Sequence, residues 1–150
     1  MSTKTHQPIE DYGVIGDLHT VALVSTEASI DFLCLPDFDS PTVFAALLDP
    51  AKGGHFSITP RLADSRRKQM YLPDTNILVT RYLSENAVAE IVDYMPVDPD
   101  SDRHCVIRTV RAVNGQIEFQ LQCCPRFDYG RELHSLRHVN HHVIEFAAKD

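Results

Sequence analysis

The sequence predicts an all-β protein, an antiparallel β-sandwich with one short helix, on three observations. Many short apolar segments are separated by turn residues, a spacing that is typical of sandwiches and barrels. The segment Gln116–Cys123 alternates strictly between apolar and polar residues, as a strand does when one face is buried and the other wet. The chain has 150 residues, 43% of them hydrophobic, enough for one domain with a sizeable core. We therefore expect residues 1–150 to form a single domain.

The expected strands follow one another along most of the chain. Five of them are Thr20–Ser25, Ile30–Leu35, His55–Thr59, Ile77–Leu83 and Val88–Tyr94. The Asn114-Gly115 pair suits a tight turn because both residues tolerate positive φ, so we expect Gln116–Cys123 to form a hairpin with Cys105–Val113. Cys105–Val113 also fits a helical stripe, but its β-branched residues favour a strand. The charged segment Asp64–Lys68 is expected to be an exposed loop.

One short helix is expected over residues 41–48. Ser40 can cap its N-terminus, Pro41 suits the first helical position, and Asp49-Pro50 would end it. The local signals for a helix are therefore complete at both ends.

A last hairpin is expected from Glu132–Val139 and His141–Ala147, joined around Asn140. It stops almost as soon as its second strand is complete. The sheet that this hairpin joins can therefore lack the strand that would follow the hairpin. We expect a sandwich that can be incomplete.

Charge and composition exclude several classes of partner. The chain has 14 Lys and Arg against 21 Asp and Glu, a net charge of −7, whereas a domain that binds phosphates is normally basic. We expect no nucleic-acid partner. No apolar run reaches the roughly 18–20 residues of a spanning helix, and no apolar signal segment follows the first residues, so we expect no membrane segment. The four cysteines form no CxxC pair, which favours a reduced, cytoplasmic chain. No phosphate-binding loop or nucleophile elbow is present, so no cofactor is expected.

Three stretches of sequence carry a family resemblance: residues 8–41, residues 91–96 and residues 125–131. In this order they resemble the N-terminal domain of bacterial and archaeal glucoamylase- and trehalase-type enzymes, glycoside hydrolase family 15. The sequence departs from the family pattern at three positions: Ala28 stands where the family commonly has Gly, Phe32 where it has Trp, and Asp37 where it has Arg.

The resemblance implies a division of labour between two domains. In that family an antiparallel β-sandwich of the super-sandwich type precedes a C-terminal barrel of paired helices, and the barrel carries the chemistry. Two glutamates of the barrel perform an inverting hydrolysis of α-glucosidic bonds, one protonating the leaving oxygen and the other activating a water. Both lie downstream of the residues present here. We therefore expect a non-catalytic domain, inactive alone, that packs against the barrel and helps to shape its entrance; the substrate can be a starch-type glucan, trehalose or another α-glucoside.

The loop Leu35–Pro41 is the best candidate for contact with substrate. Asp37 and Asp39 are carboxylates two residues apart, and Phe38 between them is a ring that can stack on a pyranose face. As a hydrolytic pair the two carboxylates lack the enclosing pocket and raised pKa that a general acid needs. A structural role is favoured, in which Asp39 or Ser40 caps the expected helix and Phe38 closes the edge of the sandwich.

Two further groups have both a functional and a structural interpretation. Tyr129 can lie on a sugar-stacking or interdomain surface, or pack with Phe127 at a strand end, which we favour. His134 and His138 would share a face suitable for a transition metal if their segment were helical. On the expected hairpin they lie on a solvated strand, so no metal is expected.

Two other functions stay open. A stand-alone carbohydrate-binding module needs an exposed aromatic platform, for which the chain has no Trp. Its candidate rings are Tyr12, Phe38, Tyr71, Tyr82 and Tyr129. A structural domain that forms homo-oligomers through an exposed sheet edge is the other alternative.

Overall fold

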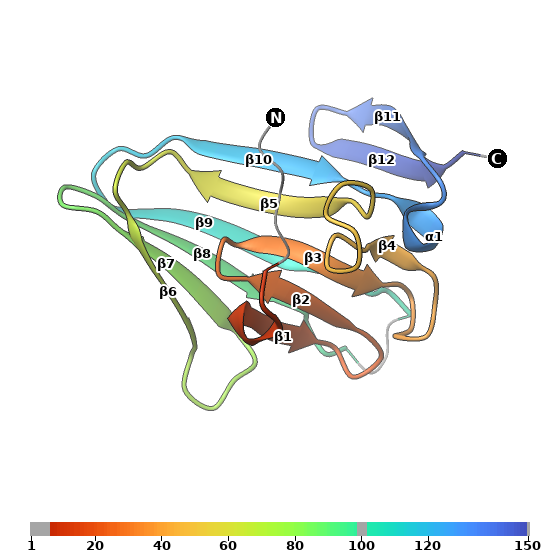
Figure 1. Ribbon diagram of the computed structural model, residues 1–150, viewed down its shortest axis with the longest axis horizontal. Coiled ribbons are helices and arrows are strands. Elements are labelled where there is room, and N and C mark those ends of the chain that lie inside the picture. Colours follow the sequence, from red (N-terminus) through yellow and green to blue (C-terminus); the bar gives the residue numbers. More distant parts are fainter. Residues whose placement is uncertain (1–6, 99–101, 150) are drawn as a thin grey trace.

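The computed structural model describes residues 7–98 and 102–149, which form two facing antiparallel sheets and a separate hairpin (Figure 1). The strands are β1 (Tyr12–Gly16), β2 (Val21–Ser25), β3 (Ser29–Cys34), β4 (Thr42–Phe44), β5 (His55–Pro60), β6 (Arg66–Tyr71), β7 (Leu78–Leu83), β8 (Val88–Tyr94), β9 (Ile107–Asn114), β10 (Phe119–Cys124), β11 (His134–Asn140) and β12 (Val143–Ala148). The first sheet has the order β1-β2-β3-β5-β10, with β4 paired to β3, and the second has the order β6-β7-β8-β9. The all-β sandwich predicted from the sequence is confirmed.

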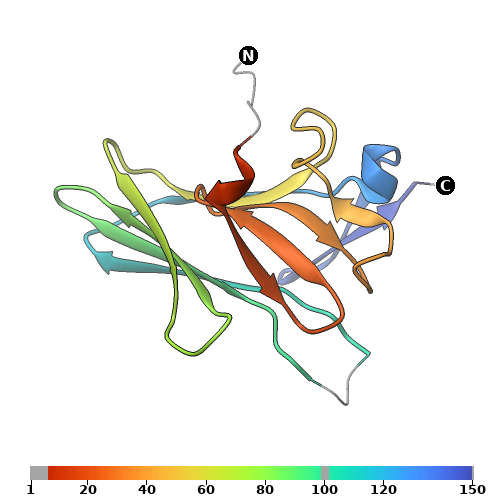
Figure 2. The ribbon, with the colours of Figure 1, turned by 60° about the horizontal axis from the view of Figure 1, so that its bottom comes forward.

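The core lies between the two sheets, which Figure 2 shows as stacked layers. It is built by alternation: in β2, Ala22 and Val24 are fully buried, while Val21 points to the outer surface. The buried apolar side chains of the core are Ile15, Ala22, Val24, Ile30, Leu33, Phe44, Leu78 and Met95 in one cluster, and Ala28, Ile58, Tyr82, Ala89 and Ile91 in the other.

A buried ion pair also joins the sheets. Nε of Arg108, in β9, donates to Oδ1 of Asp93, in β8, at 2.8 Å, and both side chains are almost completely buried. The other guanidinium nitrogens of Arg108 cross to the first sheet, where they donate to the carbonyl oxygens of Phe56 at 2.5 Å and Ala28 at 2.7 Å. The guanidinium also lies 4.7 Å from the centre of the Phe56 ring. Arg108 therefore links both sheets through one side chain.

One side of the sandwich is closed by side chains. The hydroxyl of Tyr71, in β6, donates to the carbonyl oxygen of Val14 at 2.8 Å and accepts from its N–H at 2.7 Å, which satisfies the free edge of β1. Asn76 closes the same edge lower down, where its side-chain amide donates to the carbonyl oxygen of Gly16 at 2.8 Å.

The opposite side, where β9 and β10 form the margins of the two sheets, is open. Val110 lies beside the buried Ile91 in the register of β8 and β9, and Leu121 lies beside the buried Ile58 in the register of β5 and β10. Both therefore point inward, yet they are 45% and 63% exposed. The described residues do not cover this side.

The helix predicted over residues 41–48 is wrong. Thr42–Phe44 is strand β4, which pairs with β3, and a turn closed by the N–H of Leu48 on the carbonyl oxygen of Ala45 follows it. Burial of Thr42 and Phe44 in the sandwich outweighs the local capping signal. The Ser40 hydroxyl accepts a hydrogen bond from the N–H of Asp37 and so closes the loop itself.

The hairpin predicted between Cys105–Val113 and Gln116–Cys123 is also wrong. β9 pairs with β8 in the second sheet, whereas β10 pairs with β5 in the first. Gly115 does take a positive φ of 79°. The tight hairpin turn expected at Asn114-Gly115 does not form: Asn114 ends β9, and only Gly115 takes a positive φ, at a bend that carries the chain from one sheet to the other.

The last hairpin, β11–β12, is confirmed, and Figure 1 shows it apart from the two sheets, beyond the end of β10. The side chain of Asn140 accepts a hydrogen bond from the N–H of His142 in its turn. The five expected strands are also present: Val88–Tyr94 has the expected bounds, and the other four shift by one residue at one end or both. Strands β1, β4 and β6 go beyond the expected set, and β6 includes part of the segment predicted to be a loop at Asp64–Lys68.

Candidate functional site

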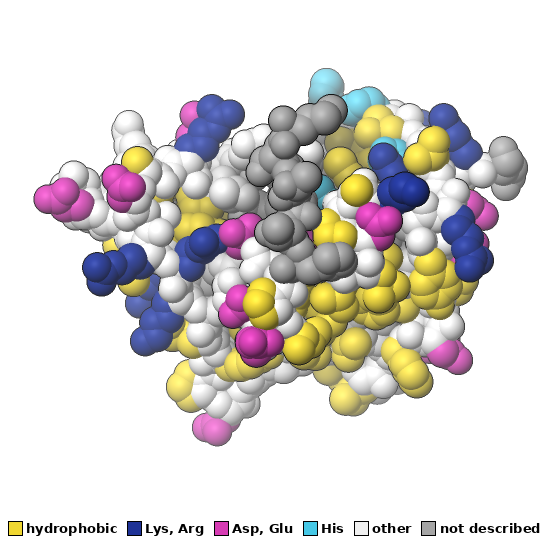
Figure 3. All heavy atoms as spheres, in the orientation of Figure 1, with side chains coloured by type: hydrophobic (Ala, Val, Ile, Leu, Met, Phe, Trp, Pro, Cys, Tyr) yellow, Lys and Arg dark blue, Asp and Glu magenta, His cyan; other side chains and the backbone are white. Residues whose placement is uncertain are grey.

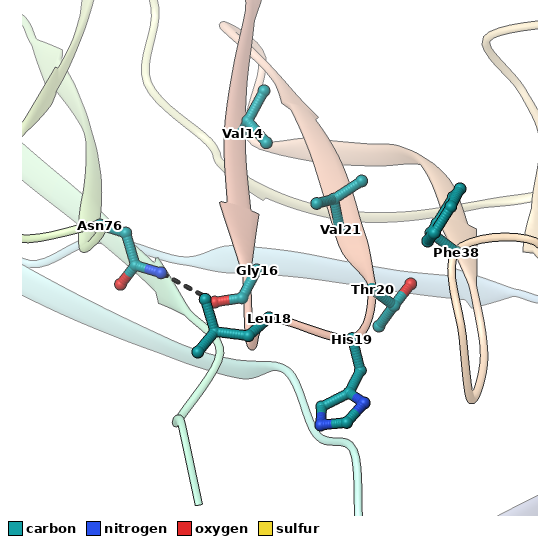
Figure 4. Close-up of a pocket in the computed structure, with 8 residues that line it drawn as sticks. All are labelled: Val14, Gly16, Leu18, His19, Thr20, Val21, Phe38 and Asn76. Atoms are coloured by element: carbon teal, nitrogen blue, oxygen red, sulfur yellow. Dashed lines mark hydrogen bonds between the residues drawn. The ribbon is translucent and has the colours of Figure 1, made fainter. Parts of the chain in front are cut away.

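The loop singled out from the sequence borders an apolar hollow at one end of the first sheet (Figure 4). The hollow lies where the β1–β2 turn, the β3–β4 loop and the β6–β7 turn meet. Its lining residues are Val14, Gly16, Leu18, His19, Thr20, Val21, Phe38 and Asn76.

A buried carboxylate fixes the β1–β2 turn. Oδ1 of Asp17 accepts from the N–H groups of His19 at 3.0 Å and Thr20 at 2.9 Å, and Oδ2 lies 2.6 Å from Nδ1 of His104. Burial by itself raises the pKa of Asp17, but the hydrogen bonds from His104 and the two N–H groups outweigh it and hold the pKa below its usual value. The turn is therefore organised around an ionised carboxylate.

This rigid turn presents Leu18 to water. Leu18 has a φ of 77°, in the left-handed region that is unfavourable for a residue with a side chain, and it is 88% exposed. The combination of a strained backbone and an exposed large apolar side chain is unusual. In proteins such strain gathers at functional sites.

Phe38 lies beside this turn. The structural interpretation predicted that Phe38 would close the edge of the sandwich, and it does not. It is 71% exposed, and its N–H donates to the carbonyl oxygen of His19 at 3.0 Å. The carboxylate of Asp37 lies 3.8 Å from Nδ1 of His19. Asp37 and Asp39 are both exposed, and Asp39 caps no helix because none follows it. The loop therefore offers an aromatic ring between two carboxylates to the solvent.

Tyr129 is not among the residues that line the hollow. It belongs to the short turn α1 (Phe127–Gly130), where it has a φ of 56° and donates its N–H to Oγ1 of Thr42 at 2.9 Å. Its ring is 46% exposed, and the Arg131 guanidinium lies 6.0 Å from the ring centre. Tyr129 thus lies at a turn beside β4 rather than at a strand end.

The histidines of β11 have structural contacts. Nδ1 of His134 lies 2.7 Å from the carbonyl oxygen of Pro125, and its ring packs edge-on against Phe146. His138 pairs in register with Ile144. The hairpin removes the helical spacing on which the metal interpretation depended, and the described residues contain no group of three or more His, Cys, Asp or Glu side chains placed to hold a metal ion.

The rings proposed as a sugar platform do not form one surface. Tyr82 is buried in the core, and the hydroxyl of Tyr71 holds the edge of β1. The hydroxyl of Tyr12 donates to Asp31 at 3.0 Å, and burial together with the Asp31 charge raises the pKa of Tyr12. Phe38, Tyr129 and Tyr71 are exposed, but they lie on two different loops and on β6.

Sequence reasoning did not single out Leu18, His19 or Val21. A positive φ at a leucine leaves no mark in a sequence. A signal was present in the next strand, however, because Val21–Val24 is apolar at four successive positions, a pattern typical of strands covered on both faces.

The fold and its apolar hollow define an antiparallel β-sandwich domain. Over residues 1–149 the sequence matches the family described as "Trehalase-like, N-terminal", and the chain belongs to this family.

The relatives include enzymes from bacteria and archaea. The trehalase of Mycolicibacterium smegmatis is 34% identical over 142 residues, which cover 83% of this chain and 21% of the relative. The trehalase of Thermoplasma volcanium is 32% identical over 137 residues, covering 88% and 22% of the two chains. Trehalase 1 of Sulfolobus acidocaldarius is 42% identical over 118 residues, covering 79% and 19%. The chain therefore spans about a fifth of the length of these curated relatives.

No solved structure matches the chain. None of the helices among the described residues is long and apolar enough to span a bilayer.

Proposed function

We propose that the chain is the non-catalytic N-terminal domain of a trehalase-like enzyme of glycoside hydrolase family 15, and that residues 1–150 act as one domain. One observation carries the proposal: the chain matches the family of trehalase N-terminal domains over residues 1–149 and corresponds to about a fifth of each curated trehalase. The hydrolytic step then belongs to the remaining polypeptide. The proposed partner is a catalytic barrel of helices.

The arrangement of carboxylates supports a non-catalytic role. Inverting glycosidases hold their two carboxyl groups roughly 6.5–9.5 Å apart across the scissile bond, in a site that raises the pKa of the acid. Asp37 and Asp39 lie on an exposed loop with no such enclosure among the described residues. We assign this loop, with Phe38, a place at the rim of the entrance to the barrel, between the surface of the barrel and the path that trehalose or an α-glucan would take. Tyr129 is a second candidate for contact with sugar, and the proposed location is the cytoplasm.

The proposal is tested by activity in two arms. The purified chain is incubated with trehalose, maltose and starch, and glucose is measured against a heat-killed control. No glucose release above the control is expected, and clear release from any of the three would contradict a non-catalytic role.

The second arm replaces the matching N-terminal part of the Mycolicibacterium smegmatis trehalase by this chain. The fusion is expected to release glucose from trehalose, whereas the same trehalase without any N-terminal part is expected to be much less active. Equal activity of the two proteins would show that the chain contributes nothing to the enzyme.

A further inference from the structure

The outer surface of the first sheet is apolar over β1, β2 and β3, although the inner surface already faces the core. Over β5 and β10 it is polar, with Ser57, Thr59, Gln120 and Gln122. Val14, Leu23 and Phe32 lie opposite one another in the registers of β1, β2 and β3, on the face away from the core. The adjoining core row of Ile15 and Ala22 is fully buried. These strands are therefore apolar on both faces, as in sheets that are covered on both sides.

The apolar side chains of this outer surface form one patch with those of the neighbouring loops. We call this patch the β1–β3 face; it consists of Val14, Val21, Leu23, Phe32, Leu18 and Phe38. Figure 3 shows hydrophobic side chains gathered over β2, β3 and β4 in the same view as Figure 1. Contiguous exposed apolar surface of this kind marks interaction sites in soluble proteins.

The second sheet has a different outer surface. Arg81, Glu90 and Arg111 lie opposite one another in β7, β8 and β9, and both guanidinium groups donate to the Glu90 carboxylate. The hydrogen bonds from the two arginines outweigh the effect of burial and lower the pKa of Glu90. A charged row of this kind is suited to water. The adjoining outer row of Met70, Val79 and Val92 is apolar, so the second sheet has a mixed outer surface. The apolar row of β1–β3 instead continues into the exposed Leu18 and Phe38, which favours the first sheet as the covered one.

Two side chains of the β1–β3 face, Leu18 and Phe38, are suited to anchor a partner. Leu18 is held out of the β1–β2 turn by a left-handed backbone and by the buried Asp17, so its position loses little freedom when a partner binds. Phe38 is fixed to the same turn through its N–H. Aromatic side chains are enriched in protein interfaces, so Phe38 is the main anchor and Leu18 the second.

We propose that the β1–β3 face docks on the catalytic part of the trehalase-like polypeptide, with Leu18 and Phe38 as anchors. This inference rests on the proposed function, because the occupant is the polypeptide that makes up about four-fifths of the curated trehalases. The carboxylates of Asp37 and Asp39 are exposed beside Phe38. The matching surface of the catalytic part should therefore be an apolar depression with a basic rim. A second copy of this chain would bring the same acidic loop against the interface, where like charges repel.

Hydroxyl-radical footprinting tests the proposal, because oxidation of a side chain reports its exposure to water. The isolated chain is compared with the fusion to the Mycolicibacterium smegmatis trehalase. Oxidation of Leu18 and Phe38 is expected to fall several-fold in the fusion. Leu83, an exposed apolar residue on the outer surface of the second sheet, serves as the matched control and is expected to be unchanged.

Variants of the fusion extend the test. Leu18→Asn suits the left-handed backbone, and Phe38→Ser removes an exposed ring, so neither change should impair folding of the sandwich. Together they are expected to restore oxidation of Val21 toward that of the isolated chain, whereas Leu83→Asn is expected to leave it low.

The outcomes separate the inference from the proposed function. Protection elsewhere in the chain, with Leu18 and Phe38 as reactive as before, overturns the docking face and leaves the proposed function standing. A fusion with no protection anywhere and no gain in activity overturns both. Protection of the two anchors in the isolated chain, at the mass of a dimer, would show that a second copy covers the face and would overturn the assignment.

Discussion

At the scale of single residues, Arg108 determines how the two sheets are joined. It pairs with Asp93 inside the second sheet and donates to two carbonyl oxygens of the first. A buried charge is tolerated only when it is paired and hydrogen-bonded, and both conditions depend here on the same guanidinium. Removal of Arg108 therefore leaves a buried carboxylate without its partner and takes one hydrogen bond from each of two carbonyl oxygens of the first sheet.

Arg108→Met is expected to lower the free energy of unfolding by about 3–5 kcal/mol, the usual cost when one partner of a buried pair is lost. Arg61→Met is the matched control, because Arg61 pairs with Glu118 on the surface and should contribute about 1 kcal/mol or less. Urea unfolding at neutral pH measures both. Equal losses in the two variants would show that Arg108 is not a link between the sheets, and the double change Asp93→Leu with Arg108→Met should recover part of the loss.

At the scale of elements, the β11–β12 hairpin differs from the rest of the chain. Its two strands pair only with each other among the described residues, and it is joined to the sandwich through the turn α1 and a few contacts such as that of His134 with Pro125. Its exposed apolar side chains are Leu136, Val139, Val143 and Ile144. A two-stranded ribbon is marginally stable by itself, so this element depends on whatever covers it.

The rate of amide hydrogen exchange in the isolated chain is expected to differ between the β11–β12 hairpin and the sandwich. Amides of residues 134–148 should exchange orders of magnitude faster than those of the buried strands β2 and β8, because a marginal hairpin opens without unfolding the sandwich. Mass spectrometry of peptides from the two regions measures the difference. Protection of the hairpin equal to that of β2 would contradict its independence.

At the scale of the whole molecule, the sandwich has one closed and one open side. Side chains of the second sheet close the edge of β1, whereas β9 and β10 leave inward-pointing apolar side chains in water. Open sheet margins with apolar side chains are sites of association between chains. We propose that the isolated chain forms homo-oligomers through this side, the second function that stayed open from the sequence.

Light scattering of the isolated chain over a range of concentrations tests this association. The mass is expected to rise above that of a monomer, and Val110→Lys with Leu121→Lys is expected to restore the monomer because charged side chains block pairing at the margin. Leu83→Lys, outside the open side, is the control. A monomeric mass at the highest concentration would contradict association through β9 and β10.

How far the sequence could predict the structure is clear from particular residues. The alternation in Gln116–Cys123 predicted a strand correctly, but its partner depends on contacts far along the chain, which a turn signal at Asn114-Gly115 cannot report. The capping signal at Ser40 was local and lost to burial of β4. Ala28 shows the opposite case: its φ of 53° explains why the family resemblance has Gly there.

The candidate site was predictable in part. Residue type alone pointed to Asp37 and Phe38, because carboxylates and a ring on a stiff loop have recognisable chemistry. Leu18 was missed because a left-handed turn at a leucine arises from the hydrogen bonds of Asp17 and His104, which are far apart in the sequence. Val21–Val24 carried the information about the outer face, and its run of four apolar residues is the signal to look for elsewhere.

The pairing of β5 with β10 has a consequence for the order of folding. Strands β6 to β9 lie between them in the sequence and form a meander in which each strand pairs with its neighbour. Local pairings form faster than those that must first close a long loop. We therefore expect the meander to form early and β10 to dock last, so that the nascent sandwich remains unfinished until residue 124 has emerged from the ribosome.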